Sequence, residues 1–113
     1  MLKISKEFRK GILFLRLKGV LNKNTINILQ DEVTNIIEKV GIYNIVFNLS
    51  SLEQIDIEGV KKLFMLYNLC RKNDGISMLC GVSKSLNKVL NSNKISYMFQ
   101  IKNELDAIRL VRI

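Results

Sequence analysis

The sequence predicts a single α/β domain with a mostly parallel central β-sheet and about four helices, in the order ββαβαβαβα. Short runs of β-branched and aromatic residues recur along the 113-residue chain, and stretches with helical periodicity separate most of them. Single helices between strands favour parallel pairing, because a right-handed crossover returns the chain to the same sheet. No glycine- or serine-rich linker interrupts the pattern, so we expect one domain over residues 1–113.

Five short segments have the composition of strands. Residues 2–8 predict a weak edge strand, and residues 12–18 predict a stronger strand that ends at a glycine. The other three segments are residues 44–49, 76–80 and 97–99, which are short, apolar and bounded by polar or glycine residues.

The first helix is expected to follow the polar turn at residues 22–25. Asn24 or Thr25 is placed to cap it, and Gly41 is placed to close it in a left-handed conformation. Its apolar stripe consists of Ile28, Leu29, Val33, Ile36, Ile37 and Val40.

A second helix is expected directly after Asp56. The Asp56 carboxylate can accept a hydrogen bond from the amide of Glu58 or Gly59, and Glu58 complements the positive end of the helix dipole. The apolar positions that follow at helical spacing are Val60, Leu63, Phe64, Leu66, Tyr67 and Leu69. On local evidence alone, Asp56 could be a structural cap with no further role.

Two more helices complete the predicted order. Ser83 caps the first of them, which ends at residues 91–93, and Asn103 opens the terminal one. Their expected inward positions are Leu86, Val89 and Leu90, and Leu105, Ile108 and Leu110.

The residue types argue against enzyme activity. The chain has no histidine, which removes the commonest general base and most catalytic zinc sites. It has no glycine-rich phosphate-binding motif, and no carboxylate pair stands out as acid and base. Cys70 and Cys80 are too far apart for a metal knuckle, so we expect buried free thiols. We therefore expect no catalytic residue, metal or cofactor.

Two further expectations concern location and charge. No apolar run approaches a membrane span and residues 1–10 do not resemble a signal peptide, which favours a cytoplasmic protein. The chain has 18 basic and 10 acidic residues, a formal net charge of +8 that invites an acidic protein or nucleic acid. The lysines are dispersed without interleaved aromatic residues, so nucleic acid is less favoured. A basic nucleic-acid or anionic-ligand binding module stays as the alternative, and biased codon usage could also explain the excess.

Several segments together resemble a known family. They are residues 16–21 with the turn 22–25, residues 46–52, the loop from Ile55 through Asp56 to Gly59, and residues 79–83. In this order and spacing, from about Leu13 to Ile108, they resemble a STAS domain and most closely the bacterial anti-sigma factor antagonists. The resemblance implies a STAS-like fold and a non-enzymatic regulator that binds an anti-sigma factor, itself a serine kinase, and so frees a sigma factor for transcription.

The sequence departs from this family at two positions. In the family, the residue after the loop aspartate is a serine or threonine whose phosphorylation blocks binding, and here it is Ile57. Isoleucine has no oxygen to accept a phosphoryl group, so we expect no phosphorylation control at this loop. The turn after the second strand is often acidic in the family, whereas this chain has Asn22.

The expected contact surface follows from the resemblance. It consists of Asn22, Asn24, Asp56, Ile57, Glu58, Gly59 and Val60. Two alternatives remain open: Ile57 could pack into the protein's own core, or the domain could be a scaffold subunit of a signalling assembly or bind another regulator.

Overall fold

The computed structural model describes residues 1–92 and 97–111, and this part of the chain forms a five-stranded mixed sheet with four α-helices. The predicted α/β class and the order ββαβαβαβα are confirmed. The elements are β1 (Leu2–Arg9), β2 (Ile12–Leu21), α1 (Ile26–Asn35), the π-helical turn η1 (Ile36–Val40), β3 (Ile45–Ile55), α2 (Ile57–Lys72), β4 (Ser77–Cys80), α3 (Lys84–Ser92), β5 (Gln100–Ile101) and α4 (Glu104–Val111).

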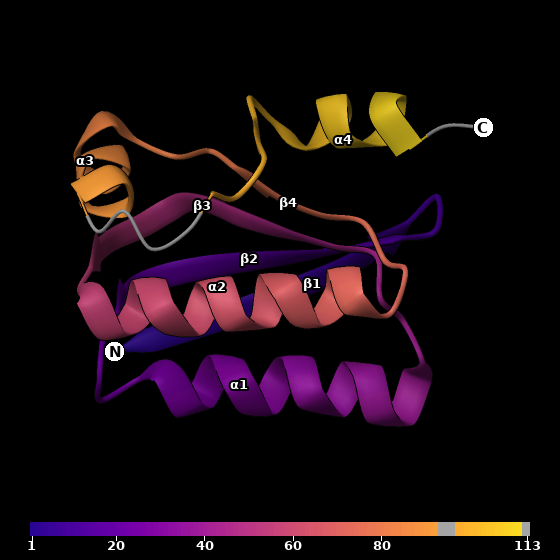
Figure 1. The fold of residues 1–113 in the computed structure, drawn as a ribbon, viewed down its shortest axis with the longest axis horizontal. Coiled ribbons are helices and arrows are strands. Elements are labelled where there is room, and N and C mark those ends of the chain that lie inside the picture. The colour runs from indigo at the N-terminus through magenta and orange to yellow at the C-terminus, as the bar shows by residue number, and fades with distance from the viewer. Residues whose placement is uncertain (93–96, 112–113) are drawn as a thin grey trace.

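The strands lie in the sheet in their chain order, β1-β2-β3-β4-β5. β1 is antiparallel to β2, and each later neighbour is parallel, as a helix between every two strands requires. α1 and α2 lie side by side under the sheet, with the N-terminal ends of both helices at the same end of the molecule (Figure 1). That end is where β2 and β3 finish, so the loops that follow these two strands are neighbours.

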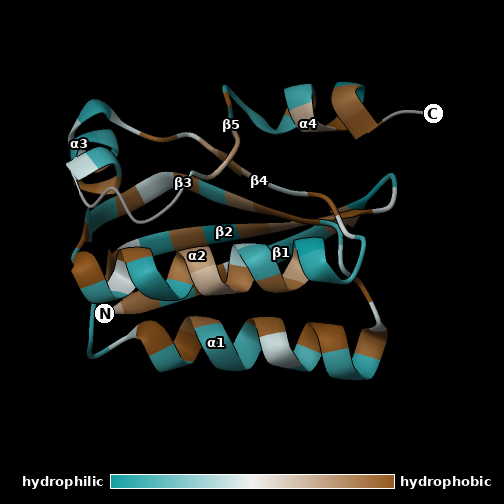
Figure 2. Ribbon diagram, in the orientation of Figure 1, coloured by the Kyte–Doolittle hydropathy of each residue, from teal (hydrophilic) through white to brown (hydrophobic). Residues whose placement is uncertain are grey.

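The sheet separates two apolar clusters. The larger one combines inward residues of the strands, such as Leu15 and Phe47, with the buried faces of α1, α2 and α3. The smaller one lies on the other face, where Ala107 of α4 covers Phe14, Val46 and neighbouring strand residues. Hydrophilic and hydrophobic residues alternate along α1 and α2, the pattern of helices that bury one side (Figure 2). No described helix is long and apolar enough to span a membrane.

Three strands differ clearly from their predicted bounds. β2 continues through Gly19, where it was expected to end, to Leu21. β3 continues to Ile55, well past the expected end at Leu49, because it pairs with β2 through two register shifts that place both Ser50 and Ser51 at the surface. The last strand is not the aromatic run 97–99 but Gln100–Ile101. Of that run only Met98 is buried. The Phe99 amide donates a hydrogen bond to the Tyr67 hydroxyl at 2.9 Å, while the Phe99 carbonyl accepts one from the Leu79 amide of β4 at 2.8 Å.

The helices differ from the predicted apolar stripes in several places. Gly41 ends the first helix in a left-handed conformation at φ 73°, as predicted, but through the π-helical turn. Ile28 and Val40 are exposed in the first helix, and Leu105 and Leu110 are exposed in the last. Ser83 and Asn103 cap α3 and α4 through Leu86 and Asp106 amides, as expected. α3 ends at Ser92, within the predicted end at residues 91–93, of which residue 93 lies outside the described residues.

Both cysteines are buried free thiols, as the sequence predicted. Burial raises the pKa of Cys70 and of Cys80 to about 11, so the unreactive thiol form prevails at neutral pH.

One polar network fixes α4 to the sheet. Glu104, the first residue of α4, accepts two hydrogen bonds from Arg16 at 2.9 and 2.8 Å and one from the Asn48 side chain at 2.8 Å. Arg9 adds a contact to the same carboxylate at 3.3 Å and lies over the Phe14 ring. These partners, Arg16 foremost, lower the pKa of Glu104 against the effect of burial. The carboxylate therefore joins α4 to three strands.

We predict that Glu104 makes the fold sensitive to acid. Because its folded pKa lies below the unfolded value of about 4.3, its stabilisation is present above that pH and is lost as the pH falls through the folded pKa. Glu104→Gln should lower the free energy of unfolding at neutral pH by about 1–3 kcal/mol and flatten its fall at acid pH. Urea unfolding at several pH values measures both. Glu53→Gln, at an exposed carboxylate, is the control, and equal behaviour of the two variants would contradict the assignment.

Candidate functional site

The Asp56 backbone and side chain join two loops. The backbone amide donates to the Leu21 carbonyl at 3.2 Å, where β2 ends. One carboxylate oxygen accepts from the Gly59 amide at 2.8 Å, and the other accepts from the Lys23 amide at 3.3 Å. The first bond caps α2, as the sequence predicted. The second was not predicted, and it ties the turn after β2 to the start of α2.

Residues 22–25 form a compact turn of their own. The Asn22 side-chain oxygen accepts from the Asn24 amide at 2.9 Å. The Thr25 hydroxyl donates to the Val20 carbonyl at 2.9 Å and accepts from the Asn22 amide at 2.9 Å. Thr25 stands at the N-cap of α1, one of the two predicted positions, but its side chain makes no capping hydrogen bond to that helix. The buried hydroxyl holds the turn to β2 instead.

Gly59 allows α2 to start against the end of β2. A Cβ atom at this position would lie 2.4 Å from the Leu21 carbonyl oxygen and 2.8 Å from the Ile55 side chain, both much closer than real contacts. Its backbone conformation is an ordinary helical one, so the need for glycine comes from space. The same carbonyl receives the Asp56 amide, and the two contacts set the position of the helix start.

The predicted contact residues divide into exposed and buried ones. Ile57 is 44% exposed, Glu58 is half-exposed and Asn24 is exposed, while Asn22 and Asp56 are partly covered by their hydrogen bonds. Because so much of Ile57 faces solvent, the alternative that it packs into the protein's own core does not hold.

Gly59 and Val60 are buried, which corrects their expected place in the contact surface. Val60 has no exposed area and packs with the larger core cluster. Gly59 is enclosed between the helix and β2. Both residues lie on the buried side of the loop, so neither can present a side chain to a partner.

The outward face of α2 adds residues that the sequence analysis did not single out as contacts. Met65, two turns after Ile57, is 47% exposed, and Phe64 is half-buried. Lys61 lies between Ile57 and Met65 on the exposed side of α2, and its ammonium group pairs with the Glu58 carboxylate at 3.7 Å. For Lys61 and Met65 the signal was in the sequence, because both lie outside the apolar stripe that begins at Val60, whereas Phe64 belongs to that stripe.

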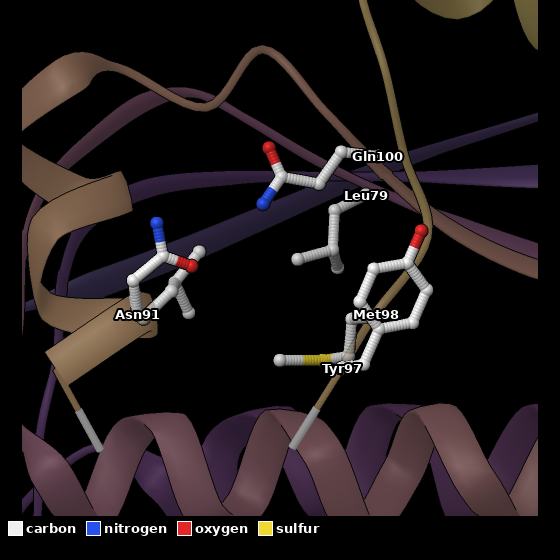
Figure 3. Close-up of a pocket in the computed structure, with 6 residues that line it drawn as sticks. Leu79, Asn91, Tyr97, Met98 and Gln100 are labelled. Atoms are coloured by element: carbon white, nitrogen blue, oxygen red, sulfur yellow. The ribbon is translucent and has the colours of Figure 1, made fainter. Parts of the chain in front are cut away.

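The described structure also contains a hollow outside this loop. Within residues 1–92 and 97–111, no group of histidine, cysteine, aspartate or glutamate side chains could hold a metal ion. A hollow of about 170 Å³ lies between α3 and the chain that enters β5, and Asn91, Met98 and Gln100 reach toward it (Figure 3). Its described lining residues carry no charge, and it contains none of the predicted contact residues.

Comparison with known proteins identifies the family. The STAS domain model matches residues 3–108, nearly the whole chain, so the protein belongs to the STAS domain family. It is similar to an anti-sigma F factor antagonist of Paenibacillus polymyxa, 25% identical over 108 residues that cover 95% of this chain and 92% of that protein.

Solved structures agree with this fold. A putative anti-sigma factor antagonist of Thermotoga maritima superposes with a TM-score of 0.85 at 18% identity, over 97% of this chain and 95% of that one. The anti-sigma factor antagonist SpoIIAA in its unphosphorylated form superposes with a TM-score of 0.75 at 18% identity, over 99% and 98%. The protein is thus an STAS domain resembling anti-sigma factor antagonists.

We predict that the two hydrogen bonds accepted by the Asp56 carboxylate stabilise the start of α2. Asp56→Ala removes the acceptor for two amides and should lower the free energy of unfolding by about 0.5–2 kcal/mol, whereas Asp56→Asn, which keeps an oxygen acceptor, should cost less. Urea unfolding monitored by circular dichroism measures both changes.

Gly59→Ala should destabilise the protein by about 1–3 kcal/mol, because the new methyl group meets the Leu21 carbonyl. In an ordinary helix the same substitution would stabilise by up to about 1 kcal/mol. The sign of the change in the free energy of unfolding, measured in urea, therefore tests the close approach of Gly59 to the Leu21 carbonyl. A stabilised variant would contradict that approach.

Proposed function

We propose that this protein is a non-enzymatic regulator that binds a kinase-fold anti-sigma factor in the cytoplasm through the turn 22–24, the Asp56–Ile57–Glu58 segment and the outward face of α2. The observation that carries the proposal is the half-exposed Ile57 on the first turn of a helix whose start is fixed by Asp56 and Gly59. An apolar side chain held in one place loses little entropy when a partner covers it, which favours binding.

The residue types on this surface indicate what kind of partner it would bind. Ile57 and Met65 provide apolar area, Lys23 provides positive charge near it, and Lys61 is paired with Glu58. A matching partner would have an apolar pocket for Ile57 with acidic residues around it. Charge complementarity of this kind mainly raises the association rate and the selectivity.

We further propose that phosphorylation does not control this loop. Neither Ile57 nor Glu58 carries a hydroxyl, and the nearby Thr25 hydroxyl is buried and engaged with the Val20 carbonyl. A phosphorylated side chain would add about −1.5 to −2 charge at the helix start, whereas Ile57 adds none. The loop would then stay in its binding-competent charge state, and control would act on the partner or on protein levels.

The alternative role as a basic nucleic-acid binding module makes a different prediction. Binding through phosphate contacts would fall steeply as salt rises and would not depend on Ile57. Binding through the loop would depend on Ile57 and change only modestly with salt.

We predict that Ile57→Asp weakens binding to a purified kinase-fold anti-sigma factor by about 30- to 100-fold, as expected for a charge placed in an apolar pocket at the centre of an interface. Isothermal titration calorimetry measures the affinity. Val40→Asp is the matched control, because Val40 is 65% exposed at the far end of the first helix. Equal affinity of parent and Ile57→Asp, both shown to be folded, would overturn the proposal.

Ile57→Ser tests directly whether the loop lacks phosphorylation control because residue 57 has no hydroxyl group. If the partner is a kinase that recognises this loop, Ile57→Ser should become phosphorylated at residue 57 in the presence of ATP, and the parent should not. Intact-mass and peptide mass spectrometry detect the product. Phosphorylation of the parent at Ser50 or Ser51 would show that another residue has taken over the switch.

A further inference from the structure

An uncovered groove lies on the face of the sheet that also carries α4. α4 covers the region around Phe14 and Val46, but the neighbouring part of β1, β2 and β3 forms a groove of about 430 Å³. Its lining includes Lys3 and Ser5 of β1, Arg16 and Lys18 of β2, and Ser51 of β3. A second hollow of about 300 Å³ shares Lys3 and Lys18 and extends to Glu53. The face is thus hollowed over three strands.

Two lysines in this groove are not neutralised. Lys3 and Lys18 lie directly opposite each other on β1 and β2, and neither makes an ion pair or hydrogen bond within residues 1–92 and 97–111. Like charges at directly opposite positions destabilise a sheet. Arg9 and Arg16 on the same strands are both paired with glutamates. An added anion beside Lys3 and Lys18 would relieve the repulsion.

The same face already binds the carboxylate of Glu104. Glu104 is bound there by the Arg16 guanidinium and the Asn48 amide. Ser5 and Ser51 bring hydroxyl groups into the free part of the groove, where they can donate to further carboxylates.

We propose that this groove is a docking surface for an extended acidic segment of a protein partner. Carboxylates of the segment lie between Lys3 and Lys18 and accept hydrogen bonds from Ser5 and Ser51. Glu53 repels the segment at the far end of the second hollow, so the carboxylates of the segment lie beside Lys3 and Lys18. This surface is separate from the loop at Asp56, and its test uses no anti-sigma factor.

Charge and shape favour an acidic peptide over nucleic acid. Among the described residues that line the groove, none has an aromatic side chain on which bases could stack, and single-strand binding surfaces depend on such stacking. It offers two unpaired cations, whereas typical DNA-binding surfaces make about 6–10 phosphate contacts.

The test is a titration of the full ¹⁵N-labelled chain with a capped hexaglutamate peptide, followed by NMR. We expect saturable shifts centred on the amides of Lys3, Ser5, Lys18 and Ser51, with an affinity that falls as salt rises. Lys3→Glu places a carboxylate opposite Lys18, two strands away from Glu53. It should raise the melting temperature by about 2 °C through the new cross-strand pair and weaken peptide binding by about tenfold.

Lys88→Glu is the matched control, because it changes the net charge equally on an exposed position of α3. It should leave the affinity within about twofold of the parent. Equal weakening by both variants, or shifts spread over lysines elsewhere, would overturn the proposal. A hexathymidylate that binds the same amides as tightly as the peptide would also overturn it, since the groove would then recognise polyanions in general.

Discussion

The contact between the start of α2 and the end of β2 determines the geometry of the candidate interface. The Leu21 carbonyl receives the Asp56 amide, and Gly59 lies so close to the same carbonyl that no side chain fits between them. Parallel pairing of β2 and β3 brings the two loops to the same end of the sheet. The Asp56 carboxylate then joins them by binding the amides of Lys23 and Gly59. Ile57 is exposed because its neighbours are held in this way.

The two faces of the sheet are covered to different extents. One face is sealed by α1, α2 and α3, whose apolar residues form the larger core. The other is only partly covered, and α4 is held there by the Glu104 network with Arg16 and Asn48. Covering only part of a face leaves the Lys3 and Lys18 groove open. Part of the high net positive charge is thus placed at Lys3 and Lys18 in this groove. The net charge as a whole also favours solubility.

The sequence predicted elements with strong periodicity and missed features that depend on distant contacts. The fold class, the Asp56 cap and the Gly41 helix end follow from local patterns, and each is present. The true last strand was missed because residues 97–99 look like a strand, although Phe99 bonds to Tyr67 from α2. Val60 was assigned to the contact surface through the family resemblance, although its helical spacing already placed it on the apolar stripe, and it is buried. The Asp56 bond to Lys23 joins residues far apart in sequence, so no local pattern encodes it.

Hydrogen exchange tests the central claim that the loop at Asp56 is the interface. Exchange of the full chain would be compared with and without a purified kinase-fold anti-sigma factor at saturating concentration. The account predicts added protection at residues 22–24 and 56–65, with α4 and the β1–β2 hairpin unchanged. Protection confined to α4 or β1, or none at all, would contradict it.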